Sequence, residues 1–412
     1  MNLLELIHNH SPAFRRQALI PALENAIQSA ESEARLLVLC GSLGSGKEST
    51  LKSLEKELNQ KNEVIAKYFN AETIEADKLA SQIRSFWHHT DEERTFLILI
   101  NNLDDLLRRD DLGQAFFDFE RELLTDLVTD GETLIIATSL TELNQWREYE
   151  VRTSQVNVQI PPLSHQELDD LVQDTEIGSD HLYQLGLGHP QISQWILRNP
   201  EISAREIASR AADYFLESLS LEASRLTLIA SQMPLFNAFI LGKVSGQAAG
   251  EVALLHLMEQ INDLMRNGLI FWDEEGSYRF RDSSVRRLIA LDLYWQEKDE
   301  FKDIHNQATA YFQDEANYPS YLHLHLVSAI YHLARANYER GADIAGQECL
   351  RWVEKNVHSW IGADWNLVLQ AWKDGAGETA VIEEIIELIG SKHYAQIGDL
   401  LIDAQATLEV KR

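Results

Sequence analysis

The sequence has few of the features that mark secreted or membrane-spanning proteins. Its 412 residues include only two cysteines, too few for a disulfide framework and compatible with a reducing compartment. No apolar run approaches the roughly 20 residues that span a bilayer. The N-terminal residues also lack the basic segment and apolar core of a secretory signal. These absences lead us to expect a cytoplasmic protein.

Basic residues are also scarce. There are 36 lysines and arginines against 65 aspartates and glutamates, which gives a formal net charge of −29. Nucleic acids and anionic membranes are bound through clustered lysine and arginine, so this balance argues against both and favours protein partners. Hydrophobic residues make up 45% and charged residues 25%, as in ordinary folded proteins, and the length corresponds to roughly two to four domains.

Residues 31–160 have the pattern of an α/β domain. Five short apolar runs, rich in β-branched residues, alternate there with amphipathic helical patterns. Buried strands joined by helices predict a parallel sheet of about five strands with helices on both faces, which is a three-layer α/β core. The predicted strands are Leu36–Cys40, Glu63–Phe69, Thr95–Ile100, Thr133–Thr138 and Val156–Ile160.

The rest of the chain is predominantly helical. The exception is a hairpin pattern, with strands at Leu269–Trp272 and Tyr278–Phe280 and a turn around Glu274 and Glu275. Three helical patterns followed by such a hairpin predict a winged helix. We therefore expect five parts: an N-terminal helical segment at 1–30, the α/β core at 31–160, a small helical region at 161–218, a winged-helix domain at 219–296 and an all-α domain at 297–412.

The strongest motif lies between the first predicted strand and the helical pattern Glu48–Asn59. The residues from Gly41 to Lys47 match G-x-x-x-x-G-K. Glycines let such a loop curl so that backbone N–H groups point at phosphate oxygens, and the following helix adds the partial positive charge of its N-terminus. The lysine reaches the β- and γ-phosphates. An ordinary glycine turn is the alternative. The predicted nucleotide-binding residues are Gly41, Ser42, Leu43, Gly44, Ser45, Gly46 and Lys47.

The position after Lys47 departs from this motif. Serine or threonine normally stands there and places its hydroxyl on Mg²⁺, but this sequence has Glu48. A carboxylate could ligate the ion directly or repel the β-phosphate, or it could serve only to complement the helix dipole. Ser49 and Thr50 follow too late in the sequence, although Ser49 is kept as a nucleotide-binding candidate. We favour impaired Mg²⁺ handling, with Glu48 as one candidate ligand.

A second departure follows the third predicted strand. Acidic residues are expected at its end, one to hold Mg²⁺ and one to activate water, but Asn101 and Asn102 occupy these places. An amide keeps the shape of an acid but loses its charge and basicity, so Asn101 is a weak candidate ligand for Mg²⁺. Asp104 and Asp105 could substitute as catalytic acids, or they could cap the helix that begins near Leu106.

Together these residues resemble the signal-transduction P-loop NTPases, the STAND class, which is related to AAA+ ATPases and to NB-ARC and NACHT modules. The resemblance covers about residues 12–295. The segment Phe14–Leu19 is similar to the arginine-containing helix before the family's first strand. The family has a helical lid after its last strand, which corresponds here to residues 161–218. Pro162-Leu163-Ser164 with Glu167 is similar to the entry of this lid, and Gly188-His189-Pro190 is similar to its glycine-x-proline motif.

The resemblance implies contacts to a nucleotide from outside the loop. Pro190 would lie against the nucleotide, unless Gly188 and Pro190 merely interrupt helices. The segment Phe280–Arg286 resembles the Met-His-Asp motif, whose histidine touches the β-phosphate of ADP, and Arg281 takes the place of that histidine. A guanidinium group suits phosphate oxygens at least as well, and the alternative is a surface arginine on the hairpin.

The resemblance also implies a regulatory switch between ADP-bound and ATP-bound states, acting through a protein partner or effector chain and through oligomerisation. This sequence departs from the family at Glu48, Asn101, Asn102 and Leu140, the last standing where relatives carry an arginine. All four are Mg²⁺ or catalytic positions, whereas the phosphate loop is intact. We therefore expect nucleotide binding to be retained and hydrolysis to be slow or absent.

Two other functions stay open. A pseudo-NTPase scaffold would keep the fold without turning over nucleotide. A winged-helix transcription regulator would need a basic surface, but residues 217–297 contain seven basic and eleven acidic residues, which disfavours nucleic acid as a partner.

Overall fold

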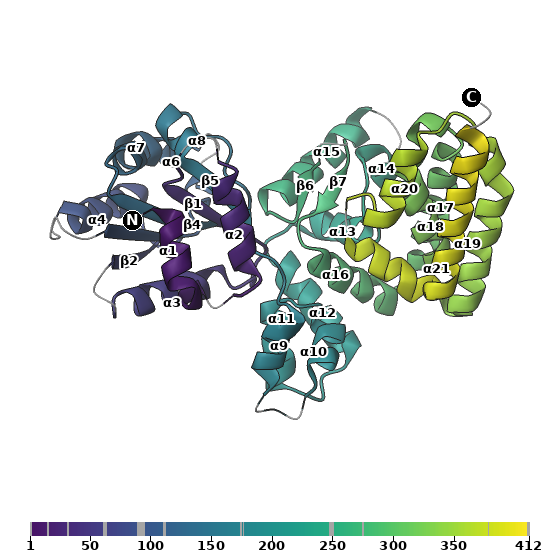
Figure 1. Ribbon diagram of the computed structural model, residues 1–412, viewed down its shortest axis with the longest axis horizontal. Helices are drawn as coiled ribbons and strands as arrows, with labels where there is room; N and C mark the ends of the chain where they lie inside the picture. Colours follow the sequence, from purple (N-terminus) through teal and green to yellow (C-terminus); the bar gives the residue numbers. More distant parts are fainter. Residues whose placement is uncertain are drawn as a thin grey trace. The chain divides into compact units, whose positions relative to one another are not determined.

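The computed structural model divides the chain into two compact units, Met1–Ile207 and Ala208–Arg412 (Figure 1). It describes residues 2–14, 16–30, 33–60, 64–88, 95–109, 113–173, 175, 177–246, 251–273, 276–377 and 379–409. Four residues of the predictions above lie outside these ranges: Arg15, Glu63, Glu274 and Glu275. The division into five parts stays a prediction.

The first unit is built around a parallel sheet of five strands, as the sequence predicts. Its strands in spatial order are β2, β3, β4, β1 and β5, so β1 pairs with β4 on one side and with β5 on the other. Each strand begins and ends within one residue of its predicted bounds. They are β1 Leu36–Cys40, β2 Val64–Asn70, β3 Thr95–Asn101, β4 Thr133–Ser139 and β5 Gln155–Gln159.

Helices cover both faces of this sheet because alternate strand residues feed two separate apolar layers. Leu37 and Leu39 of β1 pack on one side and Val38 and Cys40 on the other. The first layer holds the helices α1 Leu3–His10, η1 Ser11–Phe14, α2 Leu19–Gln28 and α3 Lys47–Leu58. The second holds α4 Ala76–His88, α5 Asp105–Arg108, α6 Gln114–Phe119, η2 Glu120–Leu124, α7 Thr125–Thr129 and α8 Tyr149–Ser154. The predicted three-layer α/β core is confirmed.

A small helical region follows β5. Its helices are α9 His165–Val172, α10 Ser179–Gly186, α11 Pro190–Arg198 and α12 Ala204–Leu216. Gly188 ends the turn between α10 and α11 with a φ of 76°, and a Cβ atom there would lie 2.8 Å from the carbonyl oxygen of Leu163. Glycine is needed at this point because both the left-handed backbone and the close approach exclude a side chain. Pro190 then starts α11, as proline favours the first helical position.

In its described residues the second unit is helical apart from one hairpin. The hairpin is antiparallel, and its first strand begins one residue later than predicted. The order of elements is α13 Leu221–Ala230, α14 Ala238–Val244, α15 Glu251–Arg266, β6 Ile270–Trp272, β7 Tyr278–Phe280, α16 Ser283–Gln296, α17 Lys298–Glu315, η3 Pro319–Tyr321, α18 Leu322–Ala336, η4 Tyr338–Arg340, α19 Ala342–Asn356, η5 Val357–Ser359, α20 Trp365–Asp374 and α21 Thr379–Glu409. The assignment of α13 to α16 as a winged helix stays a prediction.

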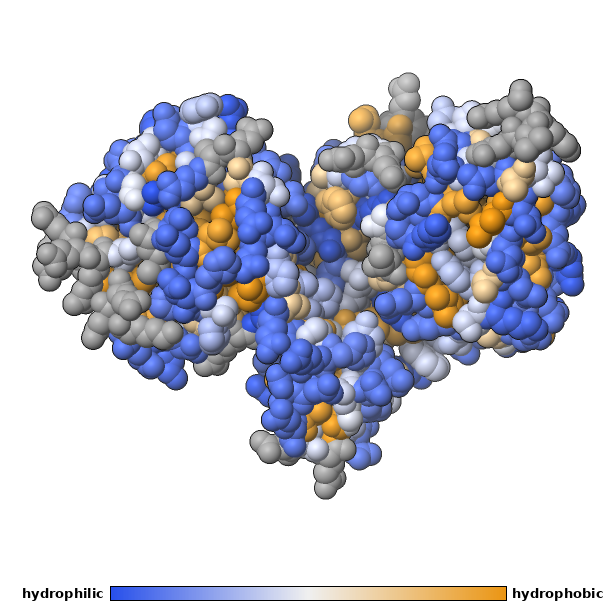
Figure 2. Space-filling model, viewed as in Figure 1, coloured by the Kyte–Doolittle hydropathy of each residue, from blue (hydrophilic) through white to orange (hydrophobic). Residues whose placement is uncertain are grey.

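The surface of both units is largely polar. On the face shown in Figure 2, hydrophilic residues cover most of the area and hydrophobic residues gather only in small patches. Across the described ranges, no helix is both long enough and apolar enough to cross a membrane.

Candidate functional site

The loop between β1 and α3 has the curled backbone that its glycines permit. Gly44 and Gly46 have φ values of 74° and 93°, a conformation that costs other residues free energy. A Cβ atom on Gly41 would lie 2.7 Å from Oγ of Ser45, so a side chain there would require the Ser45 hydroxyl to move. The loop therefore leaves room for a small anion against its backbone N–H groups at the start of a helix of 12 residues.

Lys47 lies at the centre of this loop and is buried. Its Nζ atom donates hydrogen bonds to the carbonyl oxygens of Gly41, at 2.6 Å, and Ser42, at 2.8 Å. The ammonium group is thus held inside the curl, beside the position that a β- or γ-phosphate takes in this motif. This geometry supports the phosphate loop over an ordinary glycine turn.

The hydroxyl groups that follow Lys47 point back into their own helix. Oγ of Ser49 and Oγ1 of Thr50 both donate to the carbonyl oxygen of Gly46, at 2.7 and 3.1 Å. Neither hydroxyl takes the place of the serine or threonine that should follow the lysine.

Glu48, which does occupy that place, is bound on the exposed side of α3. Its carboxylate pairs with Nζ of Lys52 at 2.5 Å and accepts a hydrogen bond from the hydroxyl of Tyr68 at 3.1 Å. The hydrogen bond from Lys52 is the main cause that lowers the pKa of Glu48, and burial opposes it. Both of these contacts are made by its Oε1 atom.

A row of polar side chains crosses the carboxyl ends of β2, β3 and β4. Asn70 and Asn101 are register partners, and Nδ2 of Asn101 donates to Oδ1 of Asn70 at 3.4 Å. Oδ1 of Asn101 accepts the hydroxyl of Thr138 at 2.8 Å, and that hydroxyl accepts the backbone N–H of Asn102 at 2.8 Å. Both ends of the Asn101 amide therefore bind protein groups, and only an amide can donate and accept in this way.

Asp104 is buried beside this row. Its Oδ2 atom accepts the backbone N–H of Leu140 at 3.1 Å and lies 3.5 Å from Nη2 of Arg108. Burial raises the pKa of Asp104, and the charge of Arg108 opposes the shift. The sequence alternative that Asp104 caps the next helix is wrong, because its side chain makes no capping hydrogen bond there. Asp105 instead pairs with Arg108 on the surface of α5.

The start of α11 packs on the phosphate loop. Nε2 of the buried His189 lies 3.1 Å from the carbonyl oxygen of Leu43 and 3.4 Å from Oγ of Ser42. Pro190 lies beside the loop as well, since a Cβ atom on Gly46 would be 3.9 Å from its Cγ. The residues at the predicted glycine-x-proline motif therefore adjoin the loop, while contact of Pro190 with a nucleotide stays a prediction.

Arg16 ties the N-terminal segment to the loop and to the region after β5. Its guanidinium donates to the carbonyl oxygens of Ser45, at 3.1 Å, and Pro161, and its Nε lies 3.4 Å from a carboxylate oxygen of Glu167. The other oxygen of Glu167 accepts the backbone N–H of Ser164 at 2.7 Å and closes the capping box of α9. Burial lowers the pKa of Arg16 and Glu167 opposes this shift, but arginine remains charged.

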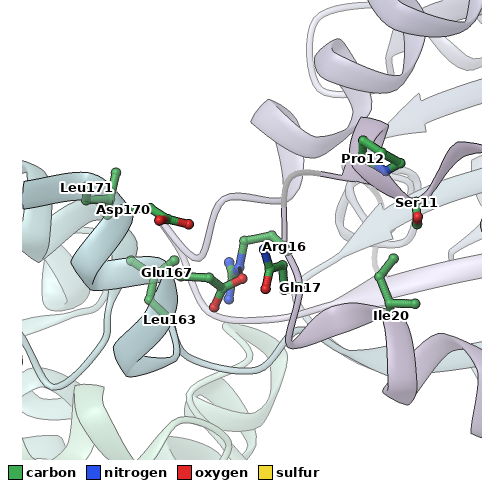
Figure 3. Close-up of a pocket in the computed structure, with 9 residues that line it drawn as sticks. All are labelled: Ser11, Pro12, Arg16, Gln17, Ile20, Leu163, Glu167, Asp170 and Leu171. Carbon is green, nitrogen blue, oxygen red and sulfur yellow. Dashed lines mark ion pairs between the residues drawn. The ribbon is translucent and has the colours of Figure 1, made fainter. Parts of the chain in front are cut away.

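A cavity of about 680 Å³ opens beside Arg16 (Figure 3). Arg16 and Glu167 face each other in the middle of its wall, with Ile20 on one side and Leu171 on the other. The walls come from the N-terminal segment and from the region that follows β5. They consist of Ser11, Pro12, Arg16, Gln17, Ile20, Leu163, Glu167, Asp170 and Leu171.

The remaining predicted site residues are the two candidates for Mg²⁺ and Arg281. Glu48 and Asn101, the two candidates for Mg²⁺, are each bound to other protein groups, so the residues present do not form a ready metal site. Nowhere in the described part of the chain do three or more His, Cys, Asp or Glu side chains converge to hold a metal ion. Arg281 belongs to the second unit, where its guanidinium lies 5.4 Å from the centre of the Phe271 ring. Its contact with a nucleotide stays a prediction.

Sequence reasoning missed Asn70 and the hydrogen bond between Asp104 and Leu140. Asn70 carries a usable signal, because it ends its strand with an asparagine just as Asn101 does. The hydrogen bond to Leu140 has no such signal, since it uses a backbone group.

Comparisons with known proteins add little to this geometry. The sequence matches no protein-family model and no curated protein. Among solved structures it is similar to Cdc6p from Pyrobaculum aerophilum, with 13% sequence identity over 70% of this chain and 95% of that chain and a TM-score of 0.29. At this TM-score the likeness carries no argument about function. The first unit itself is a parallel five-stranded α/β core with a glycine-rich loop after β1, as the sequence predicts.

Proposed function

We propose that this chain binds ADP or ATP in the loop from Gly41 to Lys47 and acts as a regulatory switch of the STAND kind, related to AAA+ proteins. One observation carries the proposal: the curled glycine loop holds a buried lysine, and Arg16, which donates to the loop carbonyl of Ser45, also lines a cavity large enough for a nucleoside. The switch would act through a protein partner or effector chain, in keeping with the net charge of −29.

The residues around the loop suggest how a nucleotide would be held. The phosphates would accept hydrogen bonds from the backbone N–H groups of the loop and from Lys47. The adenine would enter the cavity beside Arg16, where Ile20 and Leu163 offer apolar walls and Gln17 a hydrogen-bonding amide. A role of Arg281 in binding phosphate is implied only by the resemblance to the Met-His-Asp motif and stays a prediction.

Hydrolysis is proposed to be weak or absent. In working relatives Mg²⁺ neutralises the charge that develops on the phosphates, and an acidic residue orients or activates water. Here the amide of Asn101 is bound to Thr138 and Asn70, and the carboxylate of Glu48 is bound to Lys52 and Tyr68. Both positions would have to rearrange before either could assist the reaction.

The contacts of the lid suggest how the bound nucleotide would be sensed. His189 and Pro190 pack on the loop, and Arg16 joins the loop to Glu167 of α9. A phosphate entering the loop would compete with the loop carbonyl groups for the ammonium group of Lys47. This would disturb the loop backbone, which His189 and Arg16 also contact. The region 161–218 would therefore respond to the nucleotide, with assembly or partner binding as the output.

Calorimetric titration with ADP tests the proposal. We expect one site per chain, lost in Lys47→Ala and retained in Lys56→Ala, a matched change on the exposed face of the same helix. Protein that is purified without adenine nucleotide and does not bind it in the titration would refute the proposal.

A pseudo-NTPase scaffold is the second candidate. The observation that favours it is the amide of Asn101, which bridges Asn70 and Thr138 in place of a catalytic acid. Turnover of ATP above background, abolished by Lys47→Ala, would exclude this candidate and would also contradict weak hydrolysis.

A further inference from the structure

The second unit contains a small cavity that the proposed function does not use. Its volume is about 240 Å³, and its walls come from the segment after α13 and from α16, α17, α18 and α21 (Figure 1). Two arginines, Arg287 and Arg335, line it together with one acid, Glu387, the rings of Tyr294 and Phe301 and the amide of Gln232. Such a mixture of apolar walls and a few polar groups is typical of a ligand site.

A buried carboxylate behind this wall is shared by several arginines. Glu384 is completely buried and contacts three guanidinium groups, from Arg286, from Arg335 at 2.8 Å and from Arg287 at 3.9 Å. Glu387, a second acid, pairs with Arg287 at 3.0 Å but is 63% exposed. A guanidinium has five N–H donors, so these carboxylates do not occupy all the donors of Arg287 and Arg335.

Two polar atoms on the cavity wall have hydrogen-bonding capacity to spare. Arg335 uses Nε for the hydroxyl of Tyr331 and Nη2 for Glu384, and its Nη1 has no hydrogen bond within the described residues. Gln232 donates from Nε2 to the carbonyl oxygens of Leu228 and Ala290, at 3.1 and 3.3 Å, which fixes the orientation of the amide. Its Oε1 accepts no hydrogen bond from any described group.

Two buried histidines next to the cluster are consistent with a positive local potential. His305 and His332 lie 2.9 Å apart between their Nδ1 atoms. Burial is the largest cause that lowers the pKa of each, and the charges of Arg286 and Arg335 lower both further. They supply no negative charge and do not compensate the arginines.

We propose that this cavity binds a small oxyanion, the phosphate or carboxylate group of a compact molecule that also carries a hydrogen-bond donor. The anion would accept hydrogen bonds from Nη1 of Arg335 and from Arg287, and its donor would bind Oε1 of Gln232. The aromatic walls would exclude water from the pair. A volume of 240 Å³ is below the usual range of nucleotide-sized sites, so this ligand is not the nucleotide of the first unit.

Titration of inorganic phosphate, followed by the width of its ³¹P resonance, tests this site in the full-length chain. The titration uses protein carrying Lys47→Ala, so that the loop of the first unit does not contribute, and chloride keeps the ionic strength constant. We expect saturable binding with a dissociation constant of about 1 mM or below. Acetate is the second arm, since displacement of phosphate by acetate identifies a carboxylate as an acceptable ligand and failure to displace it restricts the site to phosphate.

Two variants locate the binding. Ala290→Leu fills the cavity without changing its charges, and Gln232→Leu removes the free oxygen. Each should weaken binding by at least about tenfold, whereas Arg351→Gln, which removes an exposed arginine elsewhere in the unit, should leave it unchanged. Thermal unfolding of each protein verifies that it is folded, and having two variants keeps the test decisive if one fails to fold. Absence of saturable binding, or equal binding in the folded cavity variants, would overturn the proposal.

Discussion

Asn101 carries an uncharged amide at the end of β3, where an aspartate with its negative carboxylate is expected. In this protein the amide joins three strands, because it donates to Asn70 and accepts from Thr138. An aspartate could still accept from Thr138 but could not donate to Asn70. Asparagine at this position therefore suits the hydrogen bonds around it. The negative charge that it lacks is the one that a metal ion bound there would need.

The first prediction concerns this lost charge. Replacing Glu48→Thr and Asn101→Asp together restores a hydroxyl and an acid at the two Mg²⁺ positions. We expect ATP turnover to rise at least about tenfold over the unmodified chain, as general acid–base groups typically contribute a hundredfold or more. Phosphate release with and without Mg²⁺ measures the effect. The control protein carries the same two changes elsewhere, Glu55→Thr on the same helix and Asn59→Asp at the end of that helix. No gain would mean that further catalytic parts are missing.

The second prediction concerns the buried pair of His305 and His332. The pKa of His332 is lowered to about 3 and that of His305 lies well below its ordinary value, mainly through burial. The unfolded chain binds a proton on each of these histidines near pH 6.5, and the folded chain does not. Above pH 6.5 neither state binds these protons, so they do not reduce the free energy of unfolding there. It falls below that pH by about 1.4 kcal/mol per histidine for each pH unit.

Urea unfolding at pH 7.5 and at pH 5.0 measures this loss. His332→Gln removes one of the two titrating groups. The part of the stability loss between pH 7.5 and pH 5.0 that comes from this pair should then fall to about half. His358→Gln, an exposed histidine in the same unit, should leave it unchanged. A pH dependence equal in all three proteins would contradict the assignment.

Elements far apart in the sequence meet at Arg16 and Glu167. Arg16 follows η1, contacts the loop before α3, and pairs with a residue in the first turn of α9. The N-terminal segment, the phosphate loop and the lid thus share one buried ion pair. Breaking it should affect the lid more than the sheet.

The third prediction follows from that link. Glu167→Gln can keep the capping hydrogen bond of α9 but leaves the guanidinium of Arg16 without its countercharge, at a cost of about 1–3 kcal/mol. We expect faster hydrogen exchange in 165–172 and weaker ADP binding. Asp170→Asn, on the same helix and the same cavity wall, is the matched control and should change neither. Unchanged exchange in Glu167→Gln would show that the ion pair does not hold the lid.

The strands and the loop could be predicted from the sequence because their signals are local. Each strand is a short apolar run, and the G-x-x-x-x-G-K pattern follows the first directly. The row of Asn70, Asn101 and Thr138 could not, because it depends on which strands are neighbours and in what register. The cluster around Glu384 could not be predicted either, since its arginines lie 49 to 98 positions away in the sequence.

The net charge of −29 concerns the whole molecule. A chain with this charge holds a phosphate-bearing ligand only where local positive charge is concentrated, as at Lys47 and at the start of α3. The rest of the surface repels polyanions. This argument separates a nucleotide switch from a transcription regulator better than the order of helices and hairpin does.

The fourth prediction is that the full chain does not bind duplex DNA. A gel-shift assay at about 50 mM salt favours electrostatic contacts, so even weak binding would be visible there. We expect no retarded band, with or without ADP. A retarded band that disappears as salt is raised would revive the winged-helix regulator.

An experimental density map of the full chain with saturating ADP tests the central claim most directly. The account predicts a diphosphate against the backbone N–H groups of the loop from Gly41 to Lys47, near Nζ of Lys47, with the adenine in the cavity between residues 11–20 and 163–171. ADP bound elsewhere, or a loop without ADP in the saturated protein, would contradict it.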